Sequence, residues 1–334
     1  MRTFLVFLLL LINCADSLQY AANGIVRNKS RPTRVQVQSG RVHALAVAPN
    51  PIGAEVALSI LGPSSLGFWK REYGVSYGYG GSIALAAWSA YKMASTSLGR
   101  MHALLHIVYG VRLSLFLLFR ESTVPKFKKM KEKIEEKSPP NRLQRAPFII
   151  SCAALYWWMT FPVFVTSSLA TPLKEGSTLA RAVNGCLAMA GVGLATQIVG
   201  DSHKYWAKRL DDKKLVTGGL YSLLRHPNYT GELILWSFSS LAGVLTTQSV
   251  FGRSWKALGM IAGTLLGAGG IAFILALAAT GLERRQKEEY GDTDVFKQWR
   301  KRTWKGLTLP SGPVEGSPEG PHTSNELEAE EGLC

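Results

Sequence analysis

Long apolar stretches alternate with shorter polar segments along most of the chain. Apolar stretches of about 18–25 residues are long enough to cross roughly 30 Å of hydrocarbon as helices. The candidate spans are residues 52–68 (the weakest), 75–97, 102–119, 147–170, 179–199, 228–247 and 257–281. This pattern predicts an all-α fold, a polytopic transmembrane helix bundle of about six to seven helices, within a domain that covers residues 55–310.

The polar segments between the spans alternate in charge. Lys and Arg are concentrated in residues 120–146, 201–226 and 283–305, whereas the intervening loops are short and carry few charges. Because Lys and Arg accumulate in cytoplasmic loops, one orientation places all the basic segments on the cytosolic or stromal side. The stretch KFKKMKEKIEEK at 126–137 is predicted to be a solvated linker helix without a specific partner.

Composition supports a membrane protein over a nucleic-acid-binding protein. The 334 residues are 47% hydrophobic and carry a net charge of +15. Such a charge on a soluble chain would suggest nucleic acid, but here the basic residues lie between apolar spans. The expected partners are therefore membrane lipid and a lipophilic small-molecule substrate, with no nucleic acid. The acidic tail 311–334, with six Glu and no Lys or Arg, is predicted to be disordered.

The first residues have the features of targeting segments. MRTFLVFLLLLINCADS, residues 1–17, has one Arg, a short apolar core and a small-x-small site, which predicts a signal peptide; a first transmembrane anchor is the alternative. Residues 18–54 lack Asp and Glu and contain several Arg, as in a transit-like or disordered leader. The pair resembles the bipartite presequences of algal plastid proteins. The expected location is an integral membrane protein of the endoplasmic reticulum or a plastid membrane.

Neither cysteines nor glycine motifs indicate a metal or phosphate-loop site. The four Cys include no C-x-x-C pair, so no disulfide framework or zinc site is predicted. GAGG at 267–270 follows no strand, which excludes a dinucleotide fingerprint. The spacing of Gly263 and Gly267 instead suits close packing of transmembrane helices.

The most informative stretch is GGLYSLLRHPNYTGELILW, which places polar residues at the start of an apolar span. Pro227 stops a helix that enters from upstream, and Asn228 can begin a new one, whose free N–H groups and positive dipole end suit phosphate. Arg225 adds a bidentate donor for phosphate or carboxylate. Asn228 could bind an amide such as nicotinamide. Glu232, one turn later on the same face, could accept from a ribose hydroxyl or an amide.

Two further polar clusters lie on the same predicted side. Gln197, Asp201 and Lys208 recur at helical spacing where the fifth long span leaves the membrane, and Glu283 begins a segment in which Arg and Trp alternate with acids. The predicted cofactor-binding residues are Gln197, Asp201, Lys208, Tyr221, Arg225, His226, Asn228, Tyr229, Glu232 and Glu283. The sequence identifies no catalytic residue.

A purely structural interpretation of these residues is the alternative. Arg225 and His226 would then mark the membrane interface, and Glu232 would pair with a nearby Lys or Arg. The segment after Glu283 would be an interfacial helix with snorkelling Arg and belt Trp residues. An ionisable residue inside a span is, however, functional by default.

Several segments resemble one membrane family. They are similar to the family named for the C-terminal domain of steroid 5-alpha-reductases, in the branch with R-H-P-N-Y-x-G-E. The segments are GDSHKYWAKRL, LVTGGLYSLLRHPNYTGELILW, LERRQKEEYG, FKQWRKRT and, upstream, YGVRLSLFLLFRE. The resemblance covers roughly residues 75 to 310. Isoprenylcysteine carboxyl methyltransferases and phospholipid methyltransferases share a similar R-H-P-x-Y-x-G…E core.

The resemblance implies a seven-helix bundle that binds NADPH from the cytosolic side. The residues that match the reductase cofactor motif are Asn228, Glu232, Gln197, Asp201 and Lys208. Gln197 stands where the family has Asn, and Arg225 and His226 match the methyltransferase version of the motif. The family's Glu and Tyr for the acceptor carbonyl have no aligned counterpart, and the candidates are Glu72, Tyr73, Tyr77 and Tyr79.

Three functions follow as hypotheses. The first is NADPH-dependent reduction of a conjugated carbon–carbon double bond in a lipid or sterol-like molecule, with a Tyr or Glu hydrogen-bonded to the carbonyl. The second is S-adenosylmethionine-dependent methylation of a lipid-linked carboxylate or amine. His226 and Glu232 would then hold the cofactor's amino-acid part, and Arg225 would bind the carboxylate. The third is a scaffolding membrane protein without activity.

Overall fold

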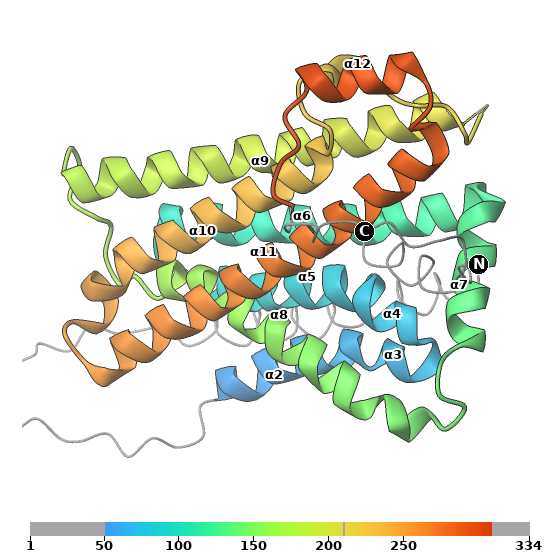
Figure 1. Ribbon diagram of the computed structural model, residues 1–334. Helices are drawn as coiled ribbons and strands as arrows, with labels where there is room; N and C mark the ends of the chain where they lie inside the picture. The colour runs from blue at the N-terminus through green and yellow to red at the C-terminus, as the bar shows by residue number, and fades with distance from the viewer. Residues whose placement is uncertain (1–50, 210, 309–334) are drawn as a thin grey trace, which may run out of the picture. The chain divides into compact units, whose positions relative to one another are not determined.

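The computed structural model describes residues 51–209 and 211–308 (Figure 1). The predicted signal peptide, nearly all of the predicted leader and the acidic tail lie outside the described residues. Helix α2 begins at Pro51, just inside the predicted leader 18–54.

The described part is built from helices. In chain order they are α2 (Pro51–Ser64), α3 (Leu66–Trp69), α4 (Arg71–Val75), α5 (Tyr77–Met93), α6 (Ser97–Thr123), α7 (Pro125–Glu136), α8 (Ala146–Ser167), α9 (Thr178–Lys208), α10 (Pro227–Phe251), α11 (Trp255–Tyr290) and α12 (Asp294–Arg302), with 3-10 turns η1 (Arg142–Arg145) and η2 (Gly219–Ser222). The five later predicted spans each lie within or closely match one of these helices, whereas 52–68 and 75–97 overlap more than one. Within the described ranges there is no strand, only an isolated bridge between Leu224 and Trp304.

The predicted fold class, a helical membrane bundle, is confirmed. Five described segments are long and apolar enough to cross a membrane. They are α6, α8 with the preceding turn η1, α9, α10 and α11. In place of the predicted spans 52–68 and 75–97, the structure has α2 and α5 as the main helices. These have 14 and 17 residues and are shorter than the predicted spans. The chain therefore fits an integral membrane protein, whereas the endoplasmic reticulum or a plastid as its location stays a prediction.

Local capping explains where the long helices begin and end. The side chains of Thr96, Ser177 and Ser254 accept hydrogen bonds from backbone N–H groups at the starts of α6, α9 and α11. Each satisfies a donor that the first helical turn leaves without an intrahelical partner. Pro227 is the first residue of α10, where its missing N–H costs nothing, and Gly252 ends that helix with φ of 60°.

Glycines bring α9 and α10 into close antiparallel contact. A Cβ atom added at Gly193 would lie 2.5 Å from the Leu235 backbone N, and one added at Gly231 would lie 2.5 Å from the Gly193 carbonyl oxygen. Gly200 similarly faces Asn228, where a Cβ would lie 3.0 Å from the backbone N. Small residues allow transmembrane backbones to approach in this way. The contact fixes which residues of the two helices face each other.

The predicted packing role of Gly263 and Gly267 is confirmed. A Cβ at Gly263 would lie 2.3 Å from the Phe161 ring, and one at Gly267 would lie 2.7 Å from the backbone of Trp158. Both neighbours belong to α8, so the two glycines seat α11 against that helix. Gly269, in the same stretch, has nothing within 4 Å.

The basic segments gather at one end of the bundle, called here the basic end. Figure 1 shows that α6, α9 and α11 finish at this end, where α10 starts, while the loops after α5, α8 and α10 lie at the other end. A hydrogen bond from the Tyr205 hydroxyl to Thr123 Oγ1, at 3.2 Å, joins the ends of α9 and α6 there. This arrangement agrees with the predicted placement of the basic segments on one side.

Residues 126–137 lie almost entirely in helix α7 with mostly exposed side chains, as predicted for a solvated helix, but intrachain ion pairs attach it to the bundle, which the sequence did not predict. Lys131 of α7 is only 5% exposed, and its Nζ lies 3.0 Å from Glu72 and 2.7 Å from Glu121. At the end of α7, Glu135 pairs with Arg145 at 2.8 Å. Because Glu72 lies far upstream on α4 and Glu121 ends α6, charge patterning within α7 alone could not identify these partners.

Candidate functional site

A cavity of about 920 Å³ opens at the basic end, among α6, α7, α9, α10 and α11. Five of the predicted site residues line it: Asp201, Lys208, Tyr221, Asn228 and Tyr229. The two predicted stretches, at the end of α9 and the start of α10, are therefore brought together on one cavity.

The lining of this cavity combines positive charge with aromatic rings. Its six basic residues are Arg120, Lys126, Lys204, Lys208, Arg209 and Arg285, against three acids, Asp201, Asp212 and Glu289. Its aromatic residues include Phe116, Phe119, Phe127, Tyr205 and Trp206. A surplus of cations suits a phosphorylated or carboxylated ligand, and the aromatic rings suit a planar group. Both features match a nucleotide cofactor.

Arg112 supports the inner wall of the cavity, and the sequence analysis did not select it. Its Nη1 lies 2.7 Å from Asp201 Oδ2, and its guanidinium stacks over the Phe116 ring at 4.9 Å. Its Nη2 is buried without a hydrogen-bond partner in the described part of the chain. An ionisable residue inside a predicted span marks a functional position, and this holds for Arg112 as it does for Glu232. The position of Arg112 in an apolar span could therefore have identified it from the sequence.

Glu232 lies one helical turn beyond Asn228 on α10 and is held by neutral donors. It is 7% exposed and accepts from the hydroxyls of Tyr79, at 2.8 Å, and Tyr109, at 2.5 Å, and from Gln197 Nε2 at 3.0 Å. The Tyr109 hydroxyl also lies 2.7 Å from that of Tyr79. The alternative that Glu232 pairs with Lys or Arg does not hold, because within the described ranges it forms no ion pair. We call Glu232, Tyr79, Tyr109 and Gln197 the Glu232 cluster.

One polar atom beside this cluster has open hydrogen-bonding capacity. Gln197 Oε1 is buried without a partner among the described residues, whereas the indole N–H of Trp236, one turn beyond Glu232 on α10, interacts with Glu232 and Tyr109. Gln197 lies one turn before Asp201 on the antiparallel helix α9. The cluster is therefore one turn deeper in the bundle than the cavity wall. A buried acceptor without a partner is costly unless a ligand or water satisfies it.

Arg225, His226 and Glu283 form a second group, called here the Glu283 clamp. Glu283 lies 2.9 Å from both Arg225 Nη1 and His226 Nε2, and Arg300 Nη2 approaches it at 3.2 Å. Arg225 Nη2 also donates to the Arg300 carbonyl at 2.8 Å, which fastens α12 to the start of α10. None of the three lines the cavity at the basic end, so their assignment to cofactor binding stays a prediction.

Burial determines the charge state of His226. The side chain is 2% exposed, and this desolvation lowers the pKa of His226 despite its hydrogen bond to Glu283. Glu283 faces two arginines and is therefore ionised, so Nε2 of the neutral imidazole carries the proton and donates to it. His226 acts here as a neutral donor inside a charged clamp.

Three other predicted residues are held mainly by structural contacts. Tyr221 donates to the Gly200 carbonyl at 3.2 Å, and burial raises the pKa of its hydroxyl. Tyr229 stacks against His226 at 5.8 Å, and Lys208 Nζ donates to the Asp212 carbonyl at 2.9 Å. All three nonetheless line the cavity, so a ligand there would contact residues that are already fixed in place.

Only one of the four candidates for an acceptor carbonyl lies near the predicted site. Glu72 pairs with Lys131, while the hydroxyls of Tyr73 and Tyr77 donate to Glu121. These three belong to the attachment of α7. Tyr79, by contrast, belongs to the Glu232 cluster.

A buried polar chain inside the bundle was missed altogether. His102 Nε2 lies 2.8 Å from Ser239 Oγ, which lies 3.1 Å from His106 Nε2, and His102 Nδ1 lies 2.8 Å from Thr166 Oγ1. His106 packs edge-on against Trp236 at 5.1 Å. The two His residues lie one turn apart in an apolar span, which is the pattern that could have indicated them.

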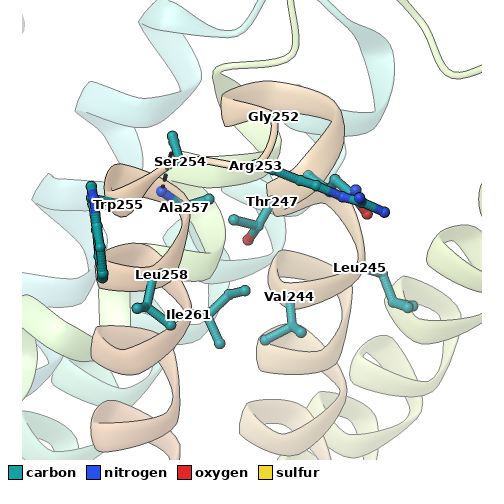
Figure 2. Close-up of a pocket in the computed structure, with 11 residues that line it drawn as sticks. Val244, Leu245, Thr247, Gly252, Arg253, Ser254, Trp255, Ala257, Leu258 and Ile261 are labelled. Atoms are coloured by element: carbon teal, nitrogen blue, oxygen red, sulfur yellow. Dashed lines mark hydrogen bonds between the residues drawn. The ribbon is translucent and has the colours of Figure 1, made fainter.

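A second cavity, of about 680 Å³, lies at the opposite end, at the turn between α10 and α11 (Figure 2). Apolar side chains such as Val244, Leu258 and Ile261 form its walls, and Arg253 is the one charged residue that lines it in the described part of the chain. Figure 2 shows Trp255 and Arg253 extending away from each other on either side of the turn. This cavity lacks the convergent polar groups that a reaction site requires.

Comparison with known proteins identifies the family. Residues 69–303, more than half of the chain, match a family described as a protein of unknown function, DUF1295. No curated protein and no solved structure matches significantly. The chain therefore belongs to this family, which falls within the steroid 5-alpha-reductase-like group.

Proposed function

We propose that the protein is a membrane-embedded, NADPH-dependent reductase of a carbon–carbon double bond in a lipid or sterol-like enone. The observation that carries the proposal is the position of the Glu232 cluster. It lies one helical turn beyond a basic, aromatic cavity whose volume of about 920 Å³ is near the top of the range for ligand pockets. Neutral hydroxyl donors thus lie next to a space that suits a dinucleotide.

The residues present fit the proposed cofactor. The basic residues of the cavity would hold its phosphates, while Asp201 and Asn228 would bind ribose hydroxyls or amide groups. Gln197 Oε1, buried without a partner within the described ranges, would accept from the N–H of a carboxamide. When bound there, NADPH would supply the hydride for the β-carbon of the enone.

The Glu232 cluster would act on the other half of the substrate. A carbonyl oxygen that reaches the cluster would accept a hydrogen bond from Tyr79 Oη or Tyr109 Oη, which stabilises negative charge as it develops on that oxygen. The α-carbon must gain a proton to complete the reduction. Tyr79 Oη is the donor that we assign, because Tyr109 Oη, at 2.7 Å, can return a proton to it. Tyr109 regains its proton from solvent once the product has left, so hydride from the cofactor and one proton from solvent complete the reduction.

Methyl transfer from S-adenosylmethionine is the second candidate, because Arg225 and His226 match that version of the motif. This mechanism would use His226 and Glu232 together on the cofactor. In the structure they belong to separate groups and share no partner: His226 contacts Glu283, and Glu232 contacts tyrosines and Gln197. The separation favours the reductase.

Isotope transfer tests the proposal. The detergent-purified protein would be incubated with NADPH carrying deuterium at the transferable position and with a panel of sterol and lipid enones. Deuterium at the β-carbon of a saturated product, and its loss in Tyr79→Phe, is the expected result. Methylated lipid formed from S-adenosylmethionine would replace the reductase with the methyltransferase. Absence of both products and of cofactor binding would favour the scaffold.

A further inference from the structure

A groove separate from the proposed reaction site lies between the last turn of α11 and helix α12. Its volume is about 560 Å³. Its lining residues are Arg225, Lys287, Gly291, Asp292, Phe296, Lys297, Arg300 and Lys301. Five of these eight residues are cationic and one is acidic. Such an excess is suited to an anion that carries more than one oxygen.

The cations in this groove differ in how far they are already neutralised. Arg225 and Arg300 share Glu283, and Lys297 lies 3.9 Å from Asp294. Lys287 and Lys301 are exposed and form no ion pair in the described part of the chain. The buried side of the groove is rigid, because Phe296 is 2% exposed and is packed against Trp299. Two unpaired ammonium groups therefore project from a fixed surface.

The level of the groove along α11 indicates where its ligand lies. The predicted apolar span ends at residue 281, and six further residues to Lys287 add about 9 Å along a helix axis. The polar region of a bilayer adds roughly 5–7 Å to each side of the hydrocarbon. Lys287 thus lies near the outer edge of the headgroup layer, and a Lys side chain can reach back into that layer.

Exposed apolar side chains beside the groove indicate contact with the membrane. Leu223 is 66% exposed and Trp304 is 56% exposed. Backbone hydrogen bonds join these residues to each other and join Trp304 to Arg225 on the groove wall. Large apolar residues, and Trp above all, are favoured at the membrane interface. A soluble protein surface would not favour such exposure.

We propose that this groove binds the headgroup of an anionic phospholipid. The phosphate and its neighbouring oxygens would lie between Lys287 of α11 and Lys297 and Lys301 of α12, with the acyl chains directed toward the bilayer. Free phosphate carries a similar negative charge, but it has no acyl chains that could add binding energy from the membrane interface. The proposal is independent of the proposed reaction, because none of these three lysines lines the cavity at the basic end.

Binding of short-chain lipids to the detergent-purified full chain tests the proposal. The probes are dihexanoyl phosphatidylglycerol, dihexanoyl phosphatidylcholine and inorganic phosphate, and the readout is the shift in melting temperature across a titration. The test variant is Lys297→Glu/Lys301→Glu. The matched control is Lys128→Glu/Lys129→Glu, which changes the same charge at exposed positions of α7. A Lys297→Gln/Lys301→Gln variant replaces the test variant if charge reversal prevents folding.

We expect phosphatidylglycerol to bind at least tenfold more tightly than phosphatidylcholine, and the groove variant to lose this preference while the α7 control keeps it. Added salt should weaken the binding. Equal affinity of the protein and its groove variant for phosphatidylglycerol would overturn the site. Inorganic phosphate that binds as tightly as phosphatidylglycerol would overturn the assignment to a lipid.

Discussion

Two carboxylates inside the bundle, the buried Glu232 on α10 and the partly buried Glu283 on α11, have very different surroundings. Glu283 is matched by Arg225, Arg300 and His226, whose contacts tie α12 to the start of α10. Glu232 has only neutral donors, and one polar atom beside it, Gln197 Oε1, has no partner within the described ranges. Both were predicted as cofactor-binding residues.

The difference separates a structural role from a functional one. A carboxylate whose charge is fully matched has little to gain from a ligand, whereas removing it leaves buried cations behind. A carboxylate held by neutral donors beside an open hydrogen-bond acceptor retains capacity for a ligand. We infer that the Glu283 clamp holds the architecture together and that the Glu232 cluster carries the chemistry.

The largest expected effect comes from breaking the clamp. Glu283→Ala leaves Arg225 buried without a counter-charge, so the free energy of unfolding should fall by about 3–5 kcal/mol. Denaturant titration in detergent measures this fall. Glu288→Ala, an exposed position of the same helix, should change the stability by no more than about 0.5 kcal/mol. Equal effects of the two substitutions would contradict a structural role for the clamp.

A second test changes the spacing of the helices that build the Glu232 cluster. Gly193→Ala places a methyl group 2.5 Å from the Leu235 backbone N. Overpacking of this kind should cost about 1–3 kcal/mol and should move Gln197 away from Glu232. Gly191→Ala on the same helix, where nothing lies within 4 Å, is the matched control. If the two variants were equally stable, the close contact between α9 and α10 would be in doubt.

Acid should weaken the clamp through His226. Burial lowers the pKa of His226, whereas in the unfolded chain it titrates near about 6.5. Below that pH the unfolded chain takes up a proton that the folded chain does not, so stability falls as the pH falls.

The expected loss is up to about 1.4 kcal/mol for each pH unit below about 6.5, until the lowered pKa is reached. Glu283, Arg225 and Lys204 surround the imidazole and influence this titration. Comparing the pH dependence of unfolding in the natural chain and in His226→Gln isolates the contribution of His226. The same slope in both proteins would remove His226 as its source.

The smallest effect on stability is expected for Glu232→Gln. An amide of the same shape can keep hydrogen bonds to the tyrosines and avoids the cost of burying a charge. The free energy of unfolding should change by less than about 1 kcal/mol. Thermal denaturation of the Glu232→Gln and Glu283→Gln variants, each compared with the natural chain, tests this contrast directly. A loss at Glu232 as large as that at Glu283 would remove the distinction between the two carboxylates.

Much of the fold could be predicted from the sequence, because a bilayer requires long apolar helices and the charge bias sets their orientation. The attachment of α7 could not, since Lys131 finds partners 59 residues upstream at Glu72 and on another helix at Glu121. Within the site, Asp201 and Asn228 could be brought together by their motifs. The separation of Glu283 from Glu232 could not be predicted from the sequence, because it depends on how α11 and α12 pack against α10.

The residues that were missed share one property. Tyr109, Arg112 and the two histidines of α6 are polar side chains in an apolar span, and they lie outside the R-H-P-N-Y-x-G-E motif. Helical spacing places His102, His106 and Tyr109 on one face of α6. Their partners, however, come from α5, α8 and α10, so their contacts could not be derived from the sequence alone.

The most direct test of the account is a thermal-shift titration of the detergent-purified protein and its Glu232→Gln variant with NADPH and, separately, with S-adenosylmethionine. A ligand that binds only the folded state raises the melting temperature once its concentration exceeds its dissociation constant. We predict stabilisation by NADPH alone, with at least tenfold weaker affinity in the variant, a loss of about 1.4 kcal/mol. Stabilisation by S-adenosylmethionine alone, or equal NADPH affinity in both proteins, would contradict the account.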